Sequence, residues 1–443
     1  MKHIILFFCS ALWTGVFSVS AQQTHLLLKV DSLFSLAERN SKQLDITHYK
    51  IGMRQNATAI EKQEAYLPEF NTSFTGAYMS NAHVWDNRFN YESTVLMPHT
   101  SIDFSVAAGY VVFNGNASKN KIAKARLEEQ IANLDYQKDK ENIQFLLLAK
   151  YLDLFALRNQ ENVYLQNIAL ADKRLSNIEK LIQQGMLTHN DQVRSQLQLT
   201  DFQLKLKEVR NNISIINHDL NTVLSLPENT VIEVDTLLYT KAPGAGEIDS
   251  YADGFADRLP ELKIAEVHTQ AAGKQVAITK AGRLPSVSLF TGDAISRPFL
   301  YATPPIDIYM HVLQVGFKVK YNISSLYTSK KQIQQAEMEQ TLSQKNEEWL
   351  RQKAEMDIHE ADVKLRDAWD KYHSQEESFR LARDNYRVVE QKYLNKFAVI
   401  TDMLDASTSL LAAQINVNNA RIGIIYQYYH LLKTCGRWEE AGK

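Results

Sequence analysis

The stretch KNKIAKARLE at residues 119–128 returns at residues 330–339 as KKQIQQAEME, a constant shift of 211 positions. The same shift carries QQGMLTHNDQV (183–193) onto LNKFAVITDML (394–404). Self-similarity at a fixed spacing is typical of one structural unit built twice. We therefore predict a duplicated unit in which each copy reads helix, two strands, very long helix, turn, helix.

The nine prolines leave two long tracts, 99–226 and 306–443, without any. Proline is poorly tolerated inside helices because it lacks an N–H donor and clashes with the preceding turn. Each tract therefore has room for one unusually long helix, near 117–184 and near 325–394. Shorter helices of about half that length would match a long one if two were stacked end to end. They are predicted near 30–66, 189–224, 253–282 and 401–435.

Apolar residues recur at spacings of three and four along both tracts. Sustained over several heptads, such spacing favours antiparallel coiled-coil hairpins over an ordinary amphipathic helix in a globular core. After the turn near Gly185 the row reads Leu199, Phe202, Leu206, Val209, Ile213, Ile216, Leu220 and Val223.

Four segments alternate apolar and polar residues. They lie at about 69–79, 100–113, 286–295 and 309–321. A two-residue alternation over about ten residues is typical of a strand of a membrane barrel, apolar toward lipid and polar toward the lumen. A half-buried sheet in a water-soluble protein shows the same alternation, so the pattern alone leaves both interpretations open.

The ends and the middle of the chain suggest its organisation. Residues 1–21 have the basic start, apolar run and small-residue end of a secretory signal. The two repeats are predicted at 22–226 and 253–436. We expect the linker at 227–252 and the tail at 437–443 to form an irregular belt around the waist of the molecule.

Composition excludes some classes of function. Lys and Arg total 49 against 51 Asp and Glu, so no basic surface for nucleic acid is expected. No window beyond the signal reaches the ~18–20 apolar residues of a membrane-spanning helix. Cys9 lies in the signal and Cys435 is the other cysteine. Export without disulfides favours a Gram-negative envelope over a small disulfide-rich secreted domain.

Four strands cannot close a barrel, and open strand edges are not viable in lipid because their backbone groups have no water to bond. Three copies would give twelve strands, enough to close around a water-filled bore. The predicted fold class is therefore a mixed α+β membrane protein. Its homotrimeric 12-stranded β-barrel, with four strands per chain, continues into a long α-helical coiled-coil barrel.

Over nearly the whole mature chain, the sequence resembles the outer-membrane efflux channel family typified by TolC. Its markers are paired Leu-Pro motifs before the first strand of each copy, VVFNGNASKNKIAKA (111–125), GMLTHND (185–191) and YLNKFAVITDMLDAS (393–407). The resemblance implies the homotrimeric exit duct of a tripartite efflux or type I secretion system, lying in the outer membrane and reaching into the periplasm. It further implies contact with outer-membrane lipid, a periplasmic adaptor protein and, through the adaptor, an inner-membrane pump. No cofactor, metal or nucleic acid is implied.

No motif in the chain predicts an enzyme: neither HExxH nor GxxxxGK[ST] occurs. His189 in the tip turn is expected to be a solvated loop residue. Asp402 and Asp405 stand three apart on one predicted helix face. In a trimer they would form two stacked rings of carboxylates that attract cations into the constriction. The alternative is an exposed acidic helix start favoured by the helix dipole, with Thr401 as its cap.

The resemblance also implies a periplasmic gate in which Tyr393 and Asp191 help to tie the helix tips shut. Asn190 stands where the family has a hydroxyl residue. Ala398 stands where the family's better-known member has an arginine that supplies further closing bonds, so other contacts are needed here. The alternative for Tyr393 is that it simply ends the heptad row that includes Tyr386.

The two tip turns are the expected docking surface for the adaptor. Their residues are Gly185, Met186 and Leu187 in the first copy, and Lys396, Phe397, Ala398 and Val399 in the second. Gly185 is predicted to end the long helix in the left-handed conformation. Because Lys396 occupies the equivalent position, the second turn is predicted to use a different geometry. The aromatic-rich loop 79–99, with Trp85, Phe89 and Tyr91, is expected to be extracellular, and a plug or plain surface are equal alternatives.

The same heptad spacing is also consistent with a second function. A structural or adhesive coiled coil in the periplasm would also need long helical hairpins, but it leaves the strand alternation without a purpose.

Overall fold

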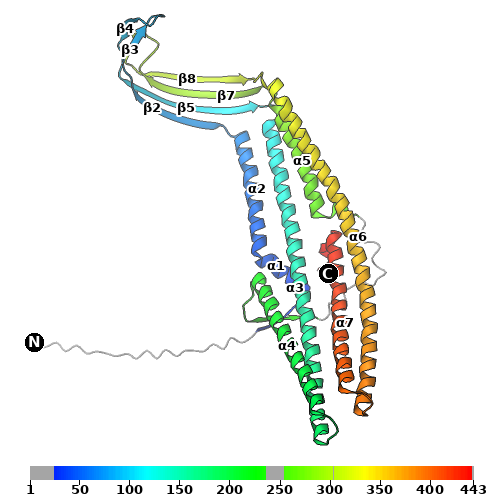
Figure 1. Cartoon of the computed structure of the whole chain (residues 1–443). Helices are drawn as coiled ribbons and strands as arrows, with labels where there is room; N and C mark the ends of the chain where they lie inside the picture. Colours follow the sequence, from blue (N-terminus) through cyan, green and yellow to red (C-terminus); the bar gives the residue numbers. More distant parts are fainter. Residues whose placement is uncertain (1–23, 236–253, 303, 442–443) are drawn as a thin grey trace, which may run out of the picture.

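The computed structural model describes residues 24–235, 254–302 and 304–441. The chain forms a long rod of helices with a curved sheet at one end and two helical turns at the other (Figure 1). The predicted signal and most of the predicted linker lie outside the described residues.

Two helices run along most of the rod. They are α3 (Ala117–Gln183) and α6 (Ser325–Leu394), at the positions of the two proline-free tracts. Each continues through a tight turn into a helix of about half its length, α4 (His189–Leu224) and α7 (Ile400–Thr434). The duplicated α+β unit predicted from the sequence is confirmed.

The upper short helices differ in detail from the prediction. The segment expected as one helix over 30–66 forms α1 (Val30–Asn40) and α2 (Lys42–Tyr66), because Ser41 takes an extended backbone conformation. The Ser41 carbonyl then accepts the first hydrogen bond of α2, from the Asp45 N–H. In the second copy α5 (Pro260–Ala281) starts later than residue 253, with Pro260 in the first turn, where its missing N–H costs nothing.

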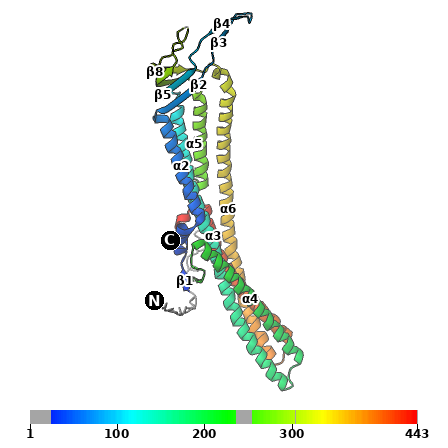
Figure 2. The ribbon, with the colours of Figure 1, turned by 90° about the vertical axis from the view of Figure 1, so that its left-hand side faces the viewer.

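The helices form a single curved layer. In its upper part α3 packs between α2 and α5, and α5 packs against α6. In the lower part α3 packs between α4 and α7, and α7 packs against α6. Helix α2 therefore stands above α4, and α5 above α7 (Figures 1 and 2). The two edges of the layer are the α2/α4 stack and α6. Among the residues described, no helix has a stretch apolar and long enough to cross a bilayer.

At the upper end, four antiparallel strands form one sheet in the order β2-β5-β7-β8. Their bounds are β2 Glu69–Tyr78, β5 Thr100–Phe113, β7 Ser286–Arg297 and β8 Met310–Lys320. Both outer strands, β2 and β8, have one side without a partner strand among the described residues. The loop 79–99 carries a short hairpin, β3 (Ala82–Trp85) and β4 (Tyr91–Val95), that projects beyond the sheet (Figure 2).

The strand register separates the two faces of the sheet. Residues directly opposite one another point to the same side. Phe74 pairs with Phe104, which pairs with Ile295, whereas Ser73 pairs with Ser105. One face is therefore mainly apolar, interrupted by an Asp293–His311 ion pair. Polar residues line much of the other: Asn71, Ser73, Thr75, Ser101, Asp103, Ser105, Ser286, Ser288, Gln314, Lys318 and Lys320.

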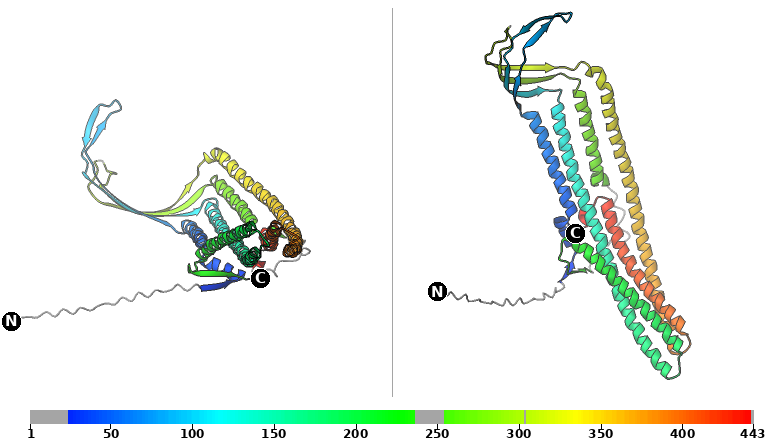
Figure 3. Two further views of the ribbon diagram at one scale, coloured as in Figure 1. Left: turned by 60° about the horizontal axis from the view of Figure 1, so that its bottom comes forward. Right: turned by 60° about the vertical axis from the view of Figure 1, so that its left-hand side comes forward.

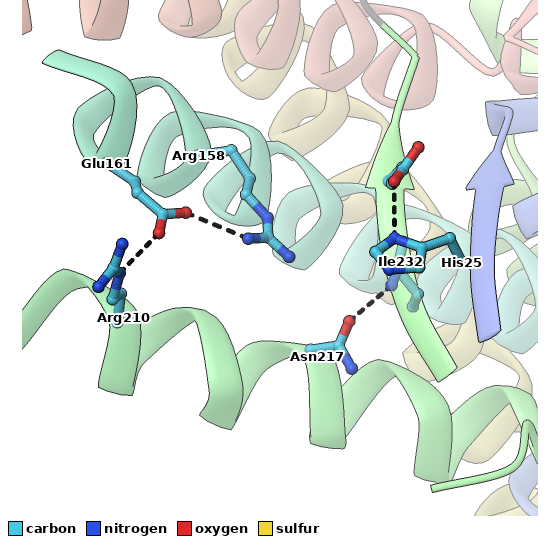
Figure 4. A network of polar contacts seen from close by, with 7 residues as sticks. His25, Arg158, Glu161, Arg210, Asn217 and Ile232 are labelled. Atoms are coloured by element: carbon cyan, nitrogen blue, oxygen red, sulfur yellow. Dashed lines mark hydrogen bonds and ion pairs between the residues drawn. The ribbon is translucent and has the colours of Figure 1, made fainter. Parts of the chain in front are cut away.

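The waist of the rod is more regular than predicted. In place of a wholly irregular belt, β6 (Thr230–Val234) pairs in parallel with β1 (Thr24–Leu28), and the tail forms a short 3₁₀ helix, η4 (Trp438–Glu440). Asn217 on α4 accepts a hydrogen bond from the Ile232 N–H, which ties this small sheet to the rod (Figure 4). Figure 3 shows the small sheet of β1 and β6 beside the helical layer.

Packing at the waist explains why these segments are ordered. The indole of Trp438 is buried and donates to Gln144 at 2.7 Å.

Below the waist, an ion-pair network joins α3 to α4. Glu161 on α3 accepts from Arg158 at 3.1 Å and from Arg210 on α4 at 2.8 Å (Figure 4). These contacts hold the α3/α4 hairpin below the waist.

Candidate functional site

The two helical tips use the same backbone turn. At the end of α3, Gly185 donates to the Ile182 carbonyl at 2.8 Å and Met186 to the Leu181 carbonyl at 2.9 Å. At the end of α6, Lys396 and Phe397 donate in the same pattern, to Tyr393 and Lys392, at 3.0 and 2.7 Å. This pair of bonds is the Schellman motif, which satisfies the last carbonyl groups of a helix.

The prediction of a different geometry at Lys396 was therefore wrong. Lys396 has φ of 66° and Gly185 has φ of 71°, so both residues are left-handed. A side chain in this conformation costs roughly 1–2 kcal/mol. Lys396 is exposed, and the two Schellman bonds offset part of that cost. Gly185 takes the predicted conformation.

Each short helix begins with an aspartate in its first turn. The Asp191 carboxylate accepts from both the backbone N–H of Thr188, at 2.9 Å, and the Thr188 hydroxyl, at 2.7 Å. The Asp402 carboxylate accepts from the Val399 N–H at 3.4 Å. The cap position of α7 is Val399, so the suggestion that Thr401 caps this helix was wrong. Valine has no polar side chain, and the Asp402 carboxylate accepts the hydrogen bond from its backbone N–H.

Asp402 and Asp405 are both exposed on α7, whereas Met403 and Ala406 beside them are buried. The two carboxylates thus share the solvent-facing side of the first two turns. This placement fits both interpretations drawn from the sequence. A ring of carboxylates needs further copies of the chain, and a local role at the helix start is already visible for Asp402.

Tyr393 lies inside the tip. Its hydroxyl is buried and has no hydrogen-bond partner among the described residues. Burial, followed by the nearby Asp191 carboxylate, raises the pKa of this hydroxyl above its usual value. The structure thus brings Tyr393 and Asp191 near one another without a direct hydrogen bond, and the bonds recorded for Asp191 go to Thr188.

The remaining predicted residues lie on the surface of the tips. Asn190 is exposed, and His189 Nδ1 is 3.3 Å from Gln192 Oε1, also in an exposed position. Met186, Phe397 and Val399 are exposed apolar side chains, and Leu187 and Ala398 are half-buried.

Sequence reasoning missed a residue that joins the two hairpins. The Arg174 guanidinium, on α3, donates to Gln198 of α4 at 2.9 Å. It also lies 3.4 Å from the Tyr386 hydroxyl of α6 and 3.2 Å from the Ser407 hydroxyl of α7. All four helices of the lower rod meet at this one side chain.

Two further contacts extend the Arg174 network. The Gln198 amide donates to the Leu404 carbonyl and to the Thr408 hydroxyl, both at 3.1 Å. The Tyr386 hydroxyl donates to Glu390 at 3.1 Å. The α3/α4 hairpin is thereby tied to the α6/α7 hairpin close to the tips.

A signal for Arg174 was present in the sequence. It stands next to Leu175, which belongs to the buried row Ala171, Leu175 and Ile178, so a charge lies at the border of an apolar helix face. A charge at such a position needs partners.

Over the described part of the chain, no three side chains of the types that bind metals gather at one point.

Comparisons with known proteins agree with this architecture. Residues 255–433 match the family model described as outer membrane efflux protein. The outer membrane efflux protein BepC of Brucella suis biovar 1 (strain 1330) is 21% identical over 436 residues, which cover 96% of this chain and 87% of that protein.

Solved structures share the fold. The outer membrane protein VceC of Vibrio cholerae superposes with a TM-score of 0.74 at 14% identity, over 92% of this chain and 96% of that one. The Campylobacter jejuni CmeC outer membrane channel superposes with a TM-score of 0.73 at 14% identity, over 98% of this chain and 94% of that one. The resemblance noted from the sequence motifs is confirmed.

Proposed function

We propose that this chain, a member of the outer-membrane efflux channel family, is one subunit of an exit duct in the outer membrane that carries substrates from the periplasm to the exterior. The observation that carries the proposal is the sheet. It has one mainly apolar face, one more polar face and, in the described part of the chain, two edges without a partner strand, and it continues directly into the layer of long helices. Such a sheet fits lipid on one side and water on the other.

Three copies would complete the wall. Unpaired strand edges are not viable within lipid, since each free N–H and C=O group there costs several kcal/mol. Joining β8 of one copy to β2 of the next removes every edge and yields twelve strands, with a bore wide enough for water. The helical layers then continue the bore through the periplasm.

The tips would meet the periplasmic adaptor. Met186 in one turn, and Phe397 and Val399 in the other, expose apolar surface at the end of the rod furthest from the sheet. Exposed apolar groups gathered in this way are typical of interaction sites. The adaptor would link the duct to an inner-membrane pump.

The gate would lie at the same end. Asp402 and Asp405 would form rings of carboxylates that attract cations. Tyr393 and Asp191 would contribute to closure next to them, and the Arg174 network would hold each pair of hairpins together. No step of chemical conversion is involved: the duct is passive.

The decisive experiment combines location with conductance. The full-length protein expressed in a Gram-negative host should fractionate with the outer membrane, and the purified protein should give discrete single-channel currents in planar bilayers. A protein that stays in the soluble periplasmic fraction and gives no currents would instead support the structural coiled coil and refute the duct.

A further inference from the structure

We propose that the chain carries a binding site for an amphiphilic organic cation in the lower rod, just below the waist. The site is a groove that crosses α3 between α4 and α7. The proposal rests on the proposed duct and names one class of substrate that the duct would carry. Three features identify the ligand: an apolar wall, a carboxylate and a glycine that keeps the groove open.

The groove has the size and the wall of a small-molecule site. Its volume is about 760 Å³. Typical ligand pockets measure roughly 300–1,000 Å³ and are mostly apolar with a few polar groups. Apolar surface gathered in a concave place is typical of a site of interaction. Three helices supply the apolar wall: Leu152, Ala156 and Leu157 of α3, Ile215 and Ile216 of α4, and Ile422 of α7.

The groove opens on the side of the layer away from the small sheet of β1 and β6. The Tyr151 hydroxyl of α3 donates to the Leu28 carbonyl of β1 and accepts from the Asp235 N–H next to β6. Asp153 stands two residues further along α3, about 200° around the helix, so it lies on the opposite side. Three copies of the small sheet inside the bore would obstruct it. In the proposed duct the small sheet therefore lies outside and the groove faces the bore.

A neighbouring copy of the chain is not placed to fill this groove. In the lower rod α3 packs between α4 and α7, so the groove lies in the middle of the layer. The copies of the proposed trimer would meet at the edges of the layer instead. The groove is thus left for a molecule that moves through the bore.

The groove has one side chain that is charged at neutral pH among the described residues that line it, Asp153. Lys150, three residues earlier, bonds to Asp219 at 2.7 Å, and no ion pair of Asp153 occurs in the described part of the chain. Loss of water raises the pKa of the Asp153 carboxyl above its usual value, and Lys150 offsets this only in part. A carboxylate in this state is stabilised by a cation that comes close to it.

An amide oxygen on α7 adds a second acceptor. Asn419 Oδ1 is buried and has no hydrogen-bond partner among the described residues, and Asn419 lines the groove. A buried acceptor costs free energy until a donor reaches it. A protonated amine brings a positive charge for Asp153 and N–H donors for Asn419. Tyr426 lines the same groove with an aromatic ring, which attracts cations.

Other ligand chemistries fit this groove less well. An anion would meet the Asp153 carboxylate and the Asn419 oxygen, both of which repel it. An uncharged apolar molecule would cover the wall but leave both acceptors without a partner. The groove therefore favours a ligand with a positive head and an apolar body.

Gly423 keeps the groove open. It lies inside α7, where glycine is a poorer helix former than alanine. Its backbone is not left-handed, and a Cβ placed there would lie in open space. Neither the backbone conformation nor a close neighbour therefore requires glycine at this position. The missing side chain leaves room at the wall of the groove.

The test measures binding of dansylcadaverine, a fluorescent primary amine with an apolar body, to the full-length protein in nanodiscs of a zwitterionic lipid. Dansyl-6-aminohexanoate carries a carboxylate in place of the ammonium group and is the matched anion. After subtraction of the signal from empty nanodiscs, we expect a saturable rise in fluorescence with the amine, at up to one molecule per chain. The anion should give no saturable rise.

Two variants change the groove in different ways. Asp153→Asn removes the charge and should weaken binding of the amine about tenfold or more, because hydrogen bonds to charged groups are the strong ones. Gly423→Leu should abolish saturable binding by filling the groove, with helical content by circular dichroism unchanged. The matched controls should bind like the wild type. They are Asp172→Asn, at an exposed aspartate of α3, and Gly52→Leu, where an added Cβ also lies in open space.

The outcomes separate the groove from the duct. Equal binding of amine and anion, or binding of the amine that neither Asp153→Asn nor Gly423→Leu changes, would overturn the site in a protein that still conducts. Saturable binding of the amine by a protein that gives no currents would refute the duct but retain the site.

A second measurement tests whether the groove faces the bore. In planar bilayers the amine should interrupt single-channel currents briefly, since a bound molecule hinders the flow of ions, and the interruptions should be shorter in Asp153→Asn. Wild-type currents that the bound amine does not change would exclude the groove from the bore.

Discussion

The Arg174 guanidinium on α3 lies 3.2 Å from the Ser407 hydroxyl on α7, so this one side chain links the α3/α4 hairpin to the α6/α7 hairpin. The same guanidinium contacts Gln198 on α4 and Tyr386 on α6. Opening the tips by moving one hairpin away from the other would break this set of bonds.

Replacing Arg174 by alanine should therefore loosen the tips. Hydrogen bonds to a charged group contribute about 1.5–3 kcal/mol, so losing about 2 kcal/mol would shift the closed-to-open ratio roughly thirtyfold. We expect larger single-channel conductance and greater sensitivity of cells to large antibiotics. Arg174→Lys should be intermediate, because a single ammonium lacks the planar fork.

Arg380→Ala is the matched control for Arg174. Arg380 is exposed on α6 and bonds to Glu377 one turn away on the same helix. Exposed pairs of this kind contribute little. A conductance change as large as that of Arg174→Ala would mean that loss of any arginine disturbs the rod.

Tyr393→Phe tests the gate role of the buried hydroxyl. Because Tyr393 Oη has no partner among the described residues, we expect thermal stability to change little. If the hydroxyl bonds to Asp191 in the closed trimer, conductance should rise. Conductance equal to that of the wild type would leave Tyr393 as the last residue of its heptad row.

Replacing Asp402 and replacing Asp405, both on α7, should affect the stability of the helix differently. Asp402→Asn weakens the bond to the Val399 N–H and the favourable interaction with the helix dipole, at a cost of about 0.3–1 kcal/mol. Asp405→Asn should not affect stability in this way. Both changes together should weaken cation selectivity and block by multivalent cations in planar bilayers, and unchanged block would exclude the ring.

The tip turns give a paired test of backbone strain. Lys396→Gly removes the side chain from a left-handed residue and should stabilise the second tip, whereas Gly185→Ala should destabilise the first by about 1 kcal/mol or more. Amide hydrogen exchange at the end of α6 should slow in the first variant, and at the end of α3 should quicken in the second. Faster exchange in Lys396→Gly, or slower exchange in Gly185→Ala, would contradict the conclusion that both tips use the same left-handed turn.

Glu141 at the waist should make stability depend on pH. Burial, then the neighbouring Glu261 carboxylate, raises the pKa of Glu141 from 4.5 to about 7. Between pH 4.5 and about 7 the Glu141 carboxyl therefore stays protonated in the folded state, whereas in the unfolded chain it has lost its proton. The resulting stabilisation is complete below pH 4.5 and is lost as pH rises to about 7.

Glu141→Gln should keep the neutral form at every pH. We expect its Tm to fall less than that of the wild type between pH 4.5 and 8, so that the variant is the more stable protein at pH 8. Glu129→Gln on the same helix is the control. If both variants follow the wild-type profile, Glu141 is not the group responsible.

The sequence by itself determined the repeating parts of this protein. Heptad spacing, the proline-free tracts and the two-residue alternation are local patterns, because each helix or strand must keep its apolar residues on one side whatever it packs against. The long helices, the four strands and the left-handed Gly185 could all be predicted in this way. The pairing of β1 with β6 could not, because it depends on contacts at the waist between residues far apart in the chain. No local pattern marks the break at Ser41.

Only the tertiary structure decided which residues meet. Arg174 and Ser407 are 233 positions apart, and no local pattern relates them. The turn at Lys396 was mispredicted because propensity favours glycine there, whereas two backbone hydrogen bonds hold lysine in the same conformation. Periodicity assigns a residue to a face of a helix, but the partner of that face depends on how the helices are arranged in the layer.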